Sequence, residues 1–127
     1  MRLWHQKLIS KLPMQQLLGQ HREVCALRGL GWGRKHSTVD YVFTHPVEWL
    51  VAYHWIVIGE MGNRGYKVDA KWCDALYRGK ISNDYEHLNI KLICELTFQP
   101  CNIYPEHDDA YYQECVENLR NKGIVIE

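Results

Sequence analysis

The fold of this 127-residue chain is decided by one apolar stretch, residues 46–58, which reads PVEWLVAYHWIVI. Its proline suits the first turn of a helix, where a missing N–H leaves no bond unmade, and Gly62 or Gly65 offers an end. Because the stretch is apolar nearly all round from Val47 to Ile58, a helix made from it has to be covered on all sides. It is also interrupted by His54 and falls short of the roughly 18 to 20 apolar residues that cross a bilayer. The sequence therefore predicts a central buried helix.

Further helices are expected on both sides of this segment. One runs from Pro13 to about Arg28 and stops at Gly29, because glycine readily ends a helix. A short one follows Asp69 as its N-cap and ends at Gly79, and the last runs from about Pro105 to Lys122. Helical spacing places on their core faces Met14, Leu17, Leu18, His21, Val24 and Cys25 in the first and Ala110, Tyr111, Cys115, Val116 and Leu119 in the last.

Residues 83–97 carry two conflicting patterns. Asn83 and Glu86 have the spacing of a capping box, which favours a helix. Residues 87–92 alternate between apolar and polar side chains, which favours a strand. We prefer the helix. The predicted fold is mainly α: a compact single-domain helical bundle of four to five helices with long loops, in which residues 1–127 form one domain.

The composition excludes several classes of protein. With 46% apolar and 24% charged residues, the chain is neither a disordered tail nor a collagen-like fibre. The N-terminus lacks the continuous apolar stretch of a signal peptide. An odd number of cysteines, with no Cys-x-x-Cys pair, favours reduced thiols and a cytoplasmic location. The cysteines, expected as small buried apolar groups, are Cys25, Cys73, Cys94, Cys101 and Cys115.

Charge is distributed unevenly along the sequence. Residues 1–36 hold seven Lys or Arg and one acid, a net charge of +6, which leaves −6 for residues 37–127 because the whole chain is neutral. A basic N-terminal third suggests a surface that faces a polyanion. The alternative is that folding interleaves the two halves and cancels the field.

The one acid in the basic third is Glu23, beside Arg22. A carboxylate among cations is expected to stay ionised, and it could orient or protonate a reacting group. Gly19, one helical turn earlier on the same face, would leave space for a substrate to approach. The alternative is a surface ion pair with Arg22 or Lys11.

The start of the chain is a second candidate. An α-amino group has a pKa of about 7.7 to 8.0, so at neutral pH part of it is the free amine and can act as a nucleophile. Because Arg2 is bulky, the initiator methionine is expected to stay, and the amine then belongs to Met1. The alternative is a frayed terminus.

A glycine-rich loop, residues 29–33, precedes the basic run Arg34, Lys35 and His36. Such a loop could hold a DNA phosphate through backbone amides and paired cations, although it does not have Walker A spacing. A flexible solvated loop is the alternative. Trp4 and Trp32, near basic residues, could stack on a base.

No metal site is predicted from the seven histidines. None has His-x-x-x-His spacing, and no pair is expected one helical turn from a cysteine in a ligand set. We interpret His21 and His54 as core histidines.

Residues 9–23 read ISKLPMQQLLGQHRE and end in an Arg-Glu pair. Three further segments are Arg34-Lys35-His36, Arg64-Gly65-Tyr66, and residues 104–107 before a helix that carries Arg120. Together these four segments resemble the pyrimidine dimer DNA glycosylases, the phage endonuclease V type. The match is thin between residues 67 and 102.

The resemblance implies an enzyme that flips a base out of damaged duplex DNA. In this family a terminal α-amine attacks the sugar C1′, expels the base and forms a Schiff base that allows β-elimination. Carried over, Met1 supplies the amine and Glu23 the carboxylate. The resemblance further implies phosphate or backbone contacts from Arg2, Arg22, Arg34, Lys35 and Arg120.

We also expect the protein to need no cofactor and to act as a monomer away from membranes. Three features depart from the family pattern. The family exposes a small residue after methionine removal, and its aromatic basic tail is replaced by residues 123–127, GIVIE. The overall charge is neutral, whereas non-specific scanning of DNA favours a basic protein. The alternatives are a nucleic-acid-binding module without catalysis and a small hydrolase that uses Glu23 with His21.

Overall fold

The computed structural model describes residues 2–29 and 39–126. Met1, Trp32, Arg34, Lys35 and His36 lie outside these ranges, so the expectations for them are not addressed by the fold. The described part contains four α-helices, three 3-10 helices and no strand, which confirms the mainly α prediction. In chain order they are η1 (Gln6–Lys11), α1 (Met14–Arg28), η2 (Asp40–Phe43), α2 (Val47–Asn63), η3 (Ala70–Cys73), α3 (Ile90–Phe98) and α4 (Asp109–Asn121).

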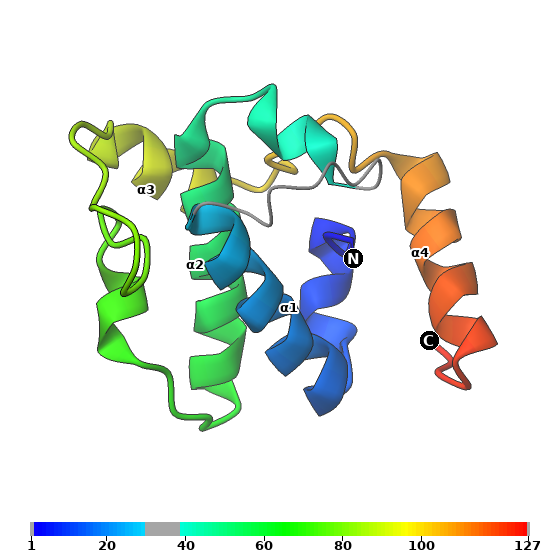
Figure 1. The fold of residues 1–127 in the computed structure, drawn as a ribbon. Coiled ribbons are helices and arrows are strands. Elements are labelled where there is room, and N and C mark those ends of the chain that lie inside the picture. Colours follow the sequence, from blue (N-terminus) through cyan, green and yellow to red (C-terminus); the bar gives the residue numbers. More distant parts are fainter. Residues whose placement is uncertain (1, 30–38, 127) are drawn as a thin grey trace.

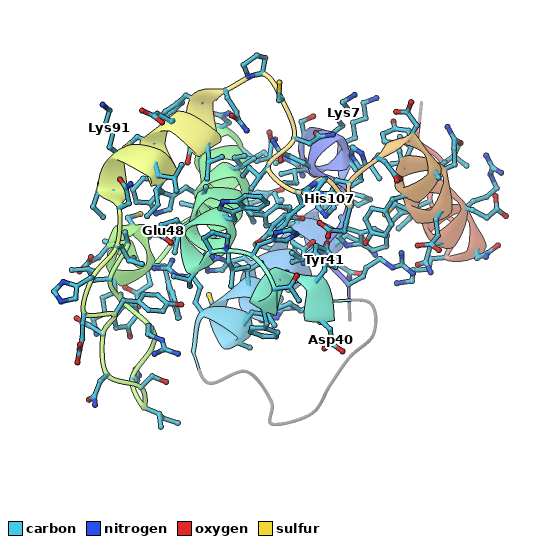
Figure 2. The ribbon with its side chains drawn as sticks, turned by 90° about the horizontal axis from the view of Figure 1, so that it is seen from above. Lys7, Asp40, Tyr41, Glu48, Lys91 and His107 are labelled. Atoms are coloured by element: carbon cyan, nitrogen blue, oxygen red, sulfur yellow. The ribbon has the colours of Figure 1, made fainter. Side chains whose placement is uncertain are left out.

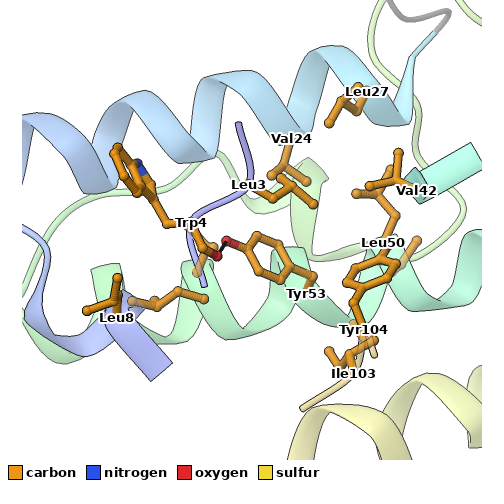
Figure 3. Close-up of a cluster of buried hydrophobic side chains, with 14 of the residues drawn as sticks. Leu3, Trp4, Leu8, Val24, Leu27, Val42, Leu50, Tyr53, Ile103 and Tyr104 are labelled. Carbon is orange, nitrogen blue, oxygen red and sulfur yellow. Dashed lines mark hydrogen bonds between the residues drawn. The ribbon is translucent and has the colours of Figure 1, made fainter. Parts of the chain in front are cut away.

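Helix α2 is the centre of the molecule, as its apolar sequence predicts. It contacts α1, α3, η1 and η2 (Figure 1). Val51, Tyr53 and Val57 are fully buried within it. Figure 3 shows Tyr53 and Leu50 on α2 facing Leu3, Val24 and other apolar side chains. No helix in residues 2–29 and 39–126 has the length and apolarity to cross a membrane.

Helix α1 has the predicted ends but a different buried face. Pro13 precedes it, and the Gly29 N–H donates to the Cys25 carbonyl at 3.2 Å. Met14, expected in the core, is 52% exposed, whereas the polar Gln20 and Arg28 are buried. Polar side chains can take core positions when their hydrogen bonds are satisfied there, and hydrophobic spacing does not reveal such partners.

The segment from η3 to α3 differs most from prediction. Asp69 caps a helix as expected, but η3 ends at Cys73 instead of continuing to Gly79. Helix α3 begins at Ile90, where Asn89 Oδ1 accepts from the Leu92 N–H at 3.0 Å. The capping box at Asn83 and the strand pattern over residues 87–92 are both wrong. The nearer cap at Asn89 leads directly into the apolar face of α3.

Helix α4 begins four residues later than expected, because Asp108 and not Pro105 leads into it. Asp108 Oδ1 accepts from the Tyr111 N–H at 2.8 Å. Cys115 and Leu119 are buried as predicted, whereas Ala110 is exposed. The Tyr111 hydroxyl donates to the Leu3 carbonyl. The N-terminal segment therefore lies between α1 and α4 (Figure 1).

A buried histidine anchors the segment before α4. The Gln6 N–H donates to His107 Nδ1 at 3.2 Å, so a neutral His107 carries its proton on Nε2 and donates it to the Tyr41 hydroxyl at 2.7 Å. His107 and Tyr41 lie close together in the middle of the molecule (Figure 2). Burial lowers the pKa of His107 to about 3, with the charge of His5 acting in the same direction.

The cysteines follow the prediction only in part. All five are free thiols, and Cys115 is buried. Cys73, Cys94 and Cys101 are exposed, so the expectation of small buried apolar groups is wrong for them.

Candidate active site

Glu23 lies half-buried on α1, where a neighbour from the same helix holds its carboxylate. Gln20 Nε2 donates to Glu23 Oε2 at 3.2 Å. Burial raises the pKa of Glu23, and positive charges that include Lys122 and Arg22 only partly offset this. Burial therefore shifts the pKa of Glu23 in the direction opposite to the shift that the surrounding cations produce. A raised carboxyl pKa suits a group that exchanges a proton near neutral pH.

The first residues of the chain are fixed beside this carboxylate. The Trp4 N–H donates to Gln20 Oε1 at 2.6 Å, and Gln20 Nε2 donates to the Arg2 carbonyl at 3.1 Å. The Tyr53 hydroxyl donates to the Trp4 carbonyl at 2.6 Å, the dashed line in Figure 3. The chain from Arg2 onward is therefore anchored next to Glu23.

Three cations surround Glu23 and the anchored segment. The guanidinium of Arg2 is 3.1 Å from Glu114 and stands over the rings of Trp4 and Tyr111, at 5.7 and 5.8 Å from their centroids. Arg22 is exposed on α1. Lys122 Nζ lies 5.4 Å from the centroid of the Trp4 ring.

Sequence reasoning missed Lys122, which follows α4. Its position depends on the packing of α4 against the N-terminal segment, and no local motif signals a contact over that sequence distance. Trp4, considered as a residue that stacks on a base, is only 6% exposed and belongs to the core. Its ring instead supports the cations above it.

Of the remaining predicted DNA contacts, the structure describes only Arg120. Arg120 is exposed on α4 and pairs with Glu117 at 2.7 Å. Arg34, Lys35 and His36 lie outside the described residues.

Gly19, expected to leave space one turn before Glu23, has an open surface. A Cβ added there would approach only the guanidinium of Arg22, at 3.8 Å, which is an ordinary contact distance. Nothing in the packing of the described residues requires glycine here. Space on this face of α1 is therefore compatible with an approaching substrate.

His21 and Cys25 of α1 form a cluster with His54 of α2. His21 Nδ1 is 2.8 Å from His54 Nε2, and Cys25 Sγ is 3.8 Å from His54 Nε2. His21 and Cys25 are one helical turn apart, so the expectation that no histidine pair meets a cysteine in this way is wrong.

Arg28 decides the chemistry of this cluster. Its guanidinium donates to His54 Nδ1 at 3.0 Å, so neutral His54 carries its proton on Nε2 and donates it to His21 Nδ1. Burial, followed by the charge of Arg28, lowers the pKa of His54 well below its usual value. Burial raises the pKa of the Cys25 thiol to about 12. In this arrangement His54, His21 and Cys25 form an uncharged hydrogen-bonded chain. A metal on His54 Nε2 would require the imidazole proton to move to Nδ1, which faces the donor groups of Arg28.

Two cavities lie away from the Glu23 carboxylate. One, of about 270 Å³, is lined by residues that include Leu27, Tyr85 and Arg78 and lies beyond the end of α1. The other, of about 420 Å³, is lined by η1, α2 and the end of α3. Glu23 lines neither of them.

Comparison with known proteins gives one match. The family model for pyrimidine dimer DNA glycosylases matches residues 1–74, more than half of the chain. The matched part includes the anchored N-terminal segment, α1 with Glu23, and α2. No curated protein and no solved structure matches the chain. By the family match, this chain belongs to the pyrimidine dimer DNA glycosylase family.

Proposed function

We propose that this protein is a DNA glycosylase with associated AP-lyase activity, which removes damaged bases, pyrimidine dimers among them, from duplex DNA. In this proposal it acts as a monomer without a cofactor. The observation that carries the proposal is one side chain with two partners: Gln20 Nε2 bonds both the Arg2 carbonyl and the Glu23 carboxylate. Met1 is joined to Arg2 by one peptide bond, so an anchor on Arg2 limits how far the amine of Met1 can stray from Glu23.

The proposed reaction uses the amine of Met1 as the nucleophile and Glu23 as the acid. The amine nitrogen of Met1 bonds to the sugar C1′ while the glycosidic bond breaks, and the base leaves with the electron pair and takes up a proton. Opening of the sugar ring gives an imine between the amine and C1′. Loss of a proton from C2′ then expels the 3′ phosphate, and water hydrolyses the imine to restore the amine. Glu23 exchanges protons during these steps, and its raised pKa supports that role.

Basic side chains bind the phosphates of the DNA in this proposal. Phosphate contacts give affinity that falls as salt rises, and they set the position of the duplex. Lys122 joins the predicted set because of its place beside Trp4. The proposed DNA-binding residues are Arg2, Arg22, Arg34, Lys35, His36, Arg120 and Lys122. The hydrolase alternative gains no support, because His21 is bonded to His54.

The variant Glu23→Gln tests the proposal. We expect it to release damaged bases at least about 100-fold more slowly, which is the lower range for loss of a general acid or base, while its affinity for the duplex is retained. The measurement is base release from UV-irradiated duplex, with binding followed separately at fixed salt. Glu95→Gln, which changes an exposed carboxylate on α3, is the matched control and should behave as wild type. Normal base release by Glu23→Gln would remove Glu23 from the reaction.

A further inference from the structure

Gln20 is a buried amide with polar partners on both its oxygen and its nitrogen. Only 1% of the surface of Gln20 is exposed. Its oxygen accepts from the Trp4 N–H at 2.6 Å and from the Tyr53 hydroxyl at 2.9 Å. Its nitrogen donates to the Arg2 carbonyl at 3.1 Å and to Glu23 Oε2 at 3.2 Å. A carboxamide has two donor hydrogens and two acceptor lone pairs, and a polar partner lies within hydrogen-bonding distance of each of these four positions.

These partners also fix which way the amide faces. A rotated amide would place its oxygen against the Arg2 carbonyl and the Glu23 carboxylate, two acceptors, and its nitrogen against the Trp4 N–H. Buried groups left without a partner are costly, so only one orientation is compatible with the site. The nitrogen must therefore point toward both the backbone of Arg2 and the acid.

Tyr53 supports the amide from α2. It is fully buried, and its hydroxyl lies within bonding distance of both Gln20 Oε1 and the Trp4 carbonyl. The hydroxyl has one hydrogen to share between these two acceptors. Gln20 is thus held in place by a buried residue of the central helix α2.

We infer that Gln20 is a positioning residue, whose carboxamide holds the start of the chain against Glu23 and so aligns the amine of Met1 with the acid. This rests on the proposed function. Gln20 acts through Arg2 and Glu23 and does not touch the substrate. A misplacement of about 1 Å between reacting groups can cost about 100-fold in rate, so loss of this amide should slow covalent chemistry much more than it weakens DNA binding.

The test compares Gln20→Ala with two controls in a borohydride-trapping assay on duplex that contains an abasic site. Gln15→Ala removes an exposed amide from the same helix, and Ile93→Ala destabilises the core from α3. All are assayed at a temperature at which unfolding measurements show each variant to be folded. We expect Gln20→Ala to trap about 10- to 100-fold more slowly, with DNA affinity within threefold of wild type, and both controls to trap normally.

A second variant covers the case in which Gln20→Ala does not fold. Gln20→Glu keeps the shape, but its carboxyl can donate to the Arg2 carbonyl or Glu23 only while it is protonated. Its trapping rate relative to wild type should therefore fall as pH rises. If Gln20 only filled space in the core, the ratio of the two trapping rates would not change with pH over the range in which both proteins remain folded.

These experiments distinguish a failure of the positioning role of Gln20 from a failure of the proposed function. Trapping by Gln20→Ala at the wild-type rate, or a loss equal to that of folded Ile93→Ala, overturns the role of Gln20 alone. A flat pH ratio near one for Gln20→Glu does the same. If the wild-type protein traps nothing while it binds the duplex, the proposed function itself fails.

Discussion

Arg28 shows how one buried charged residue organises the surrounding chain. Its side chain is fully buried at the end of α1, and it donates to the carbonyls of Trp72, Asp74, Ala75 and Tyr77 at 2.8 to 3.1 Å. A buried charge is tolerated only when it is so compensated. The loop after η3 is therefore built around this guanidinium and not around an apolar core of its own.

Replacing Arg28 with methionine should destabilise the protein by about 3 kcal/mol or more, because several buried carbonyls lose a charged donor at once. Denaturant unfolding measures the loss as a lower midpoint. Arg22→Met, which changes an exposed arginine on the same helix, is the control and should change stability little. Equal midpoints for the two variants would show that the loop does not depend on Arg28.

At the scale of elements, proline and glycine predict the ends of α1 and α2 well. Both residues act locally: Pro13 and Pro46 precede the helices, and Gly29 follows α1. Residues 83–97 were harder, because two local patterns competed there. The helix that forms begins at Ile90, after the Asn89 cap, and packs against α2.

The same limit applies to the candidate site. Glu23 stands out in the sequence because it is the one acid in a basic stretch. Gln20 does not stand out, since a glutamine in a helix is ordinary until Trp4 and Tyr53 are seen to bond it. Lys122 likewise depends on the docking of α4. Residues that act through contacts distant in sequence were not found by local reasoning.

The two asparagines near α3 allow a direct test of the helix start. Asn89→Ala should cost about 1 kcal/mol of stability, because it removes the side-chain oxygen that caps the Leu92 N–H. Asn83→Ala, which removes the residue with capping-box spacing in the sequence, should be close to neutral. Thermal or denaturant unfolding of both variants measures the difference. A larger loss from Asn83→Ala would place the cap where the sequence pattern first suggested it.

At the scale of the whole molecule, the fold brings the two ends of the described chain together. Arg2 pairs with Glu114, Tyr111 bonds the Leu3 carbonyl, and Lys122 stands over Trp4. The basic N-terminal third thus meets the acidic remainder at Glu114, so part of its charge is neutralised within the molecule. The charge asymmetry of the sequence overstates the field that DNA would meet.

Buried histidines make the stability of the whole molecule depend on pH. An unfolded histidine has a pKa of about 6.5, whereas burial lowers that of His107 to about 3 and also lowers those of His5 and His54. Between pH 6.5 and 3 these histidines bind protons in the unfolded chain that the folded protein excludes, so their contribution to stability falls as pH falls.

Denaturant midpoints measured from pH 7 to pH 4 check this expectation. The wild-type midpoint should fall steadily below about pH 6.5, and His107→Gln should show a shallower fall over the same range even if it is less stable at pH 7. A wild-type midpoint that stays constant or rises on acidification would contradict the buried neutral state of these histidines.

We propose that the amine of Met1, held beside Glu23 through Arg2 and Gln20, bonds covalently to the sugar of a damaged nucleotide. The most direct measurement is borohydride trapping of the untagged protein on duplex containing an abasic site, followed by peptide mapping of the adduct. We predict a covalent complex at residue 1, and an N-terminal tag should abolish it. An adduct on a lysine side chain, or equal trapping by the tagged protein, would contradict it.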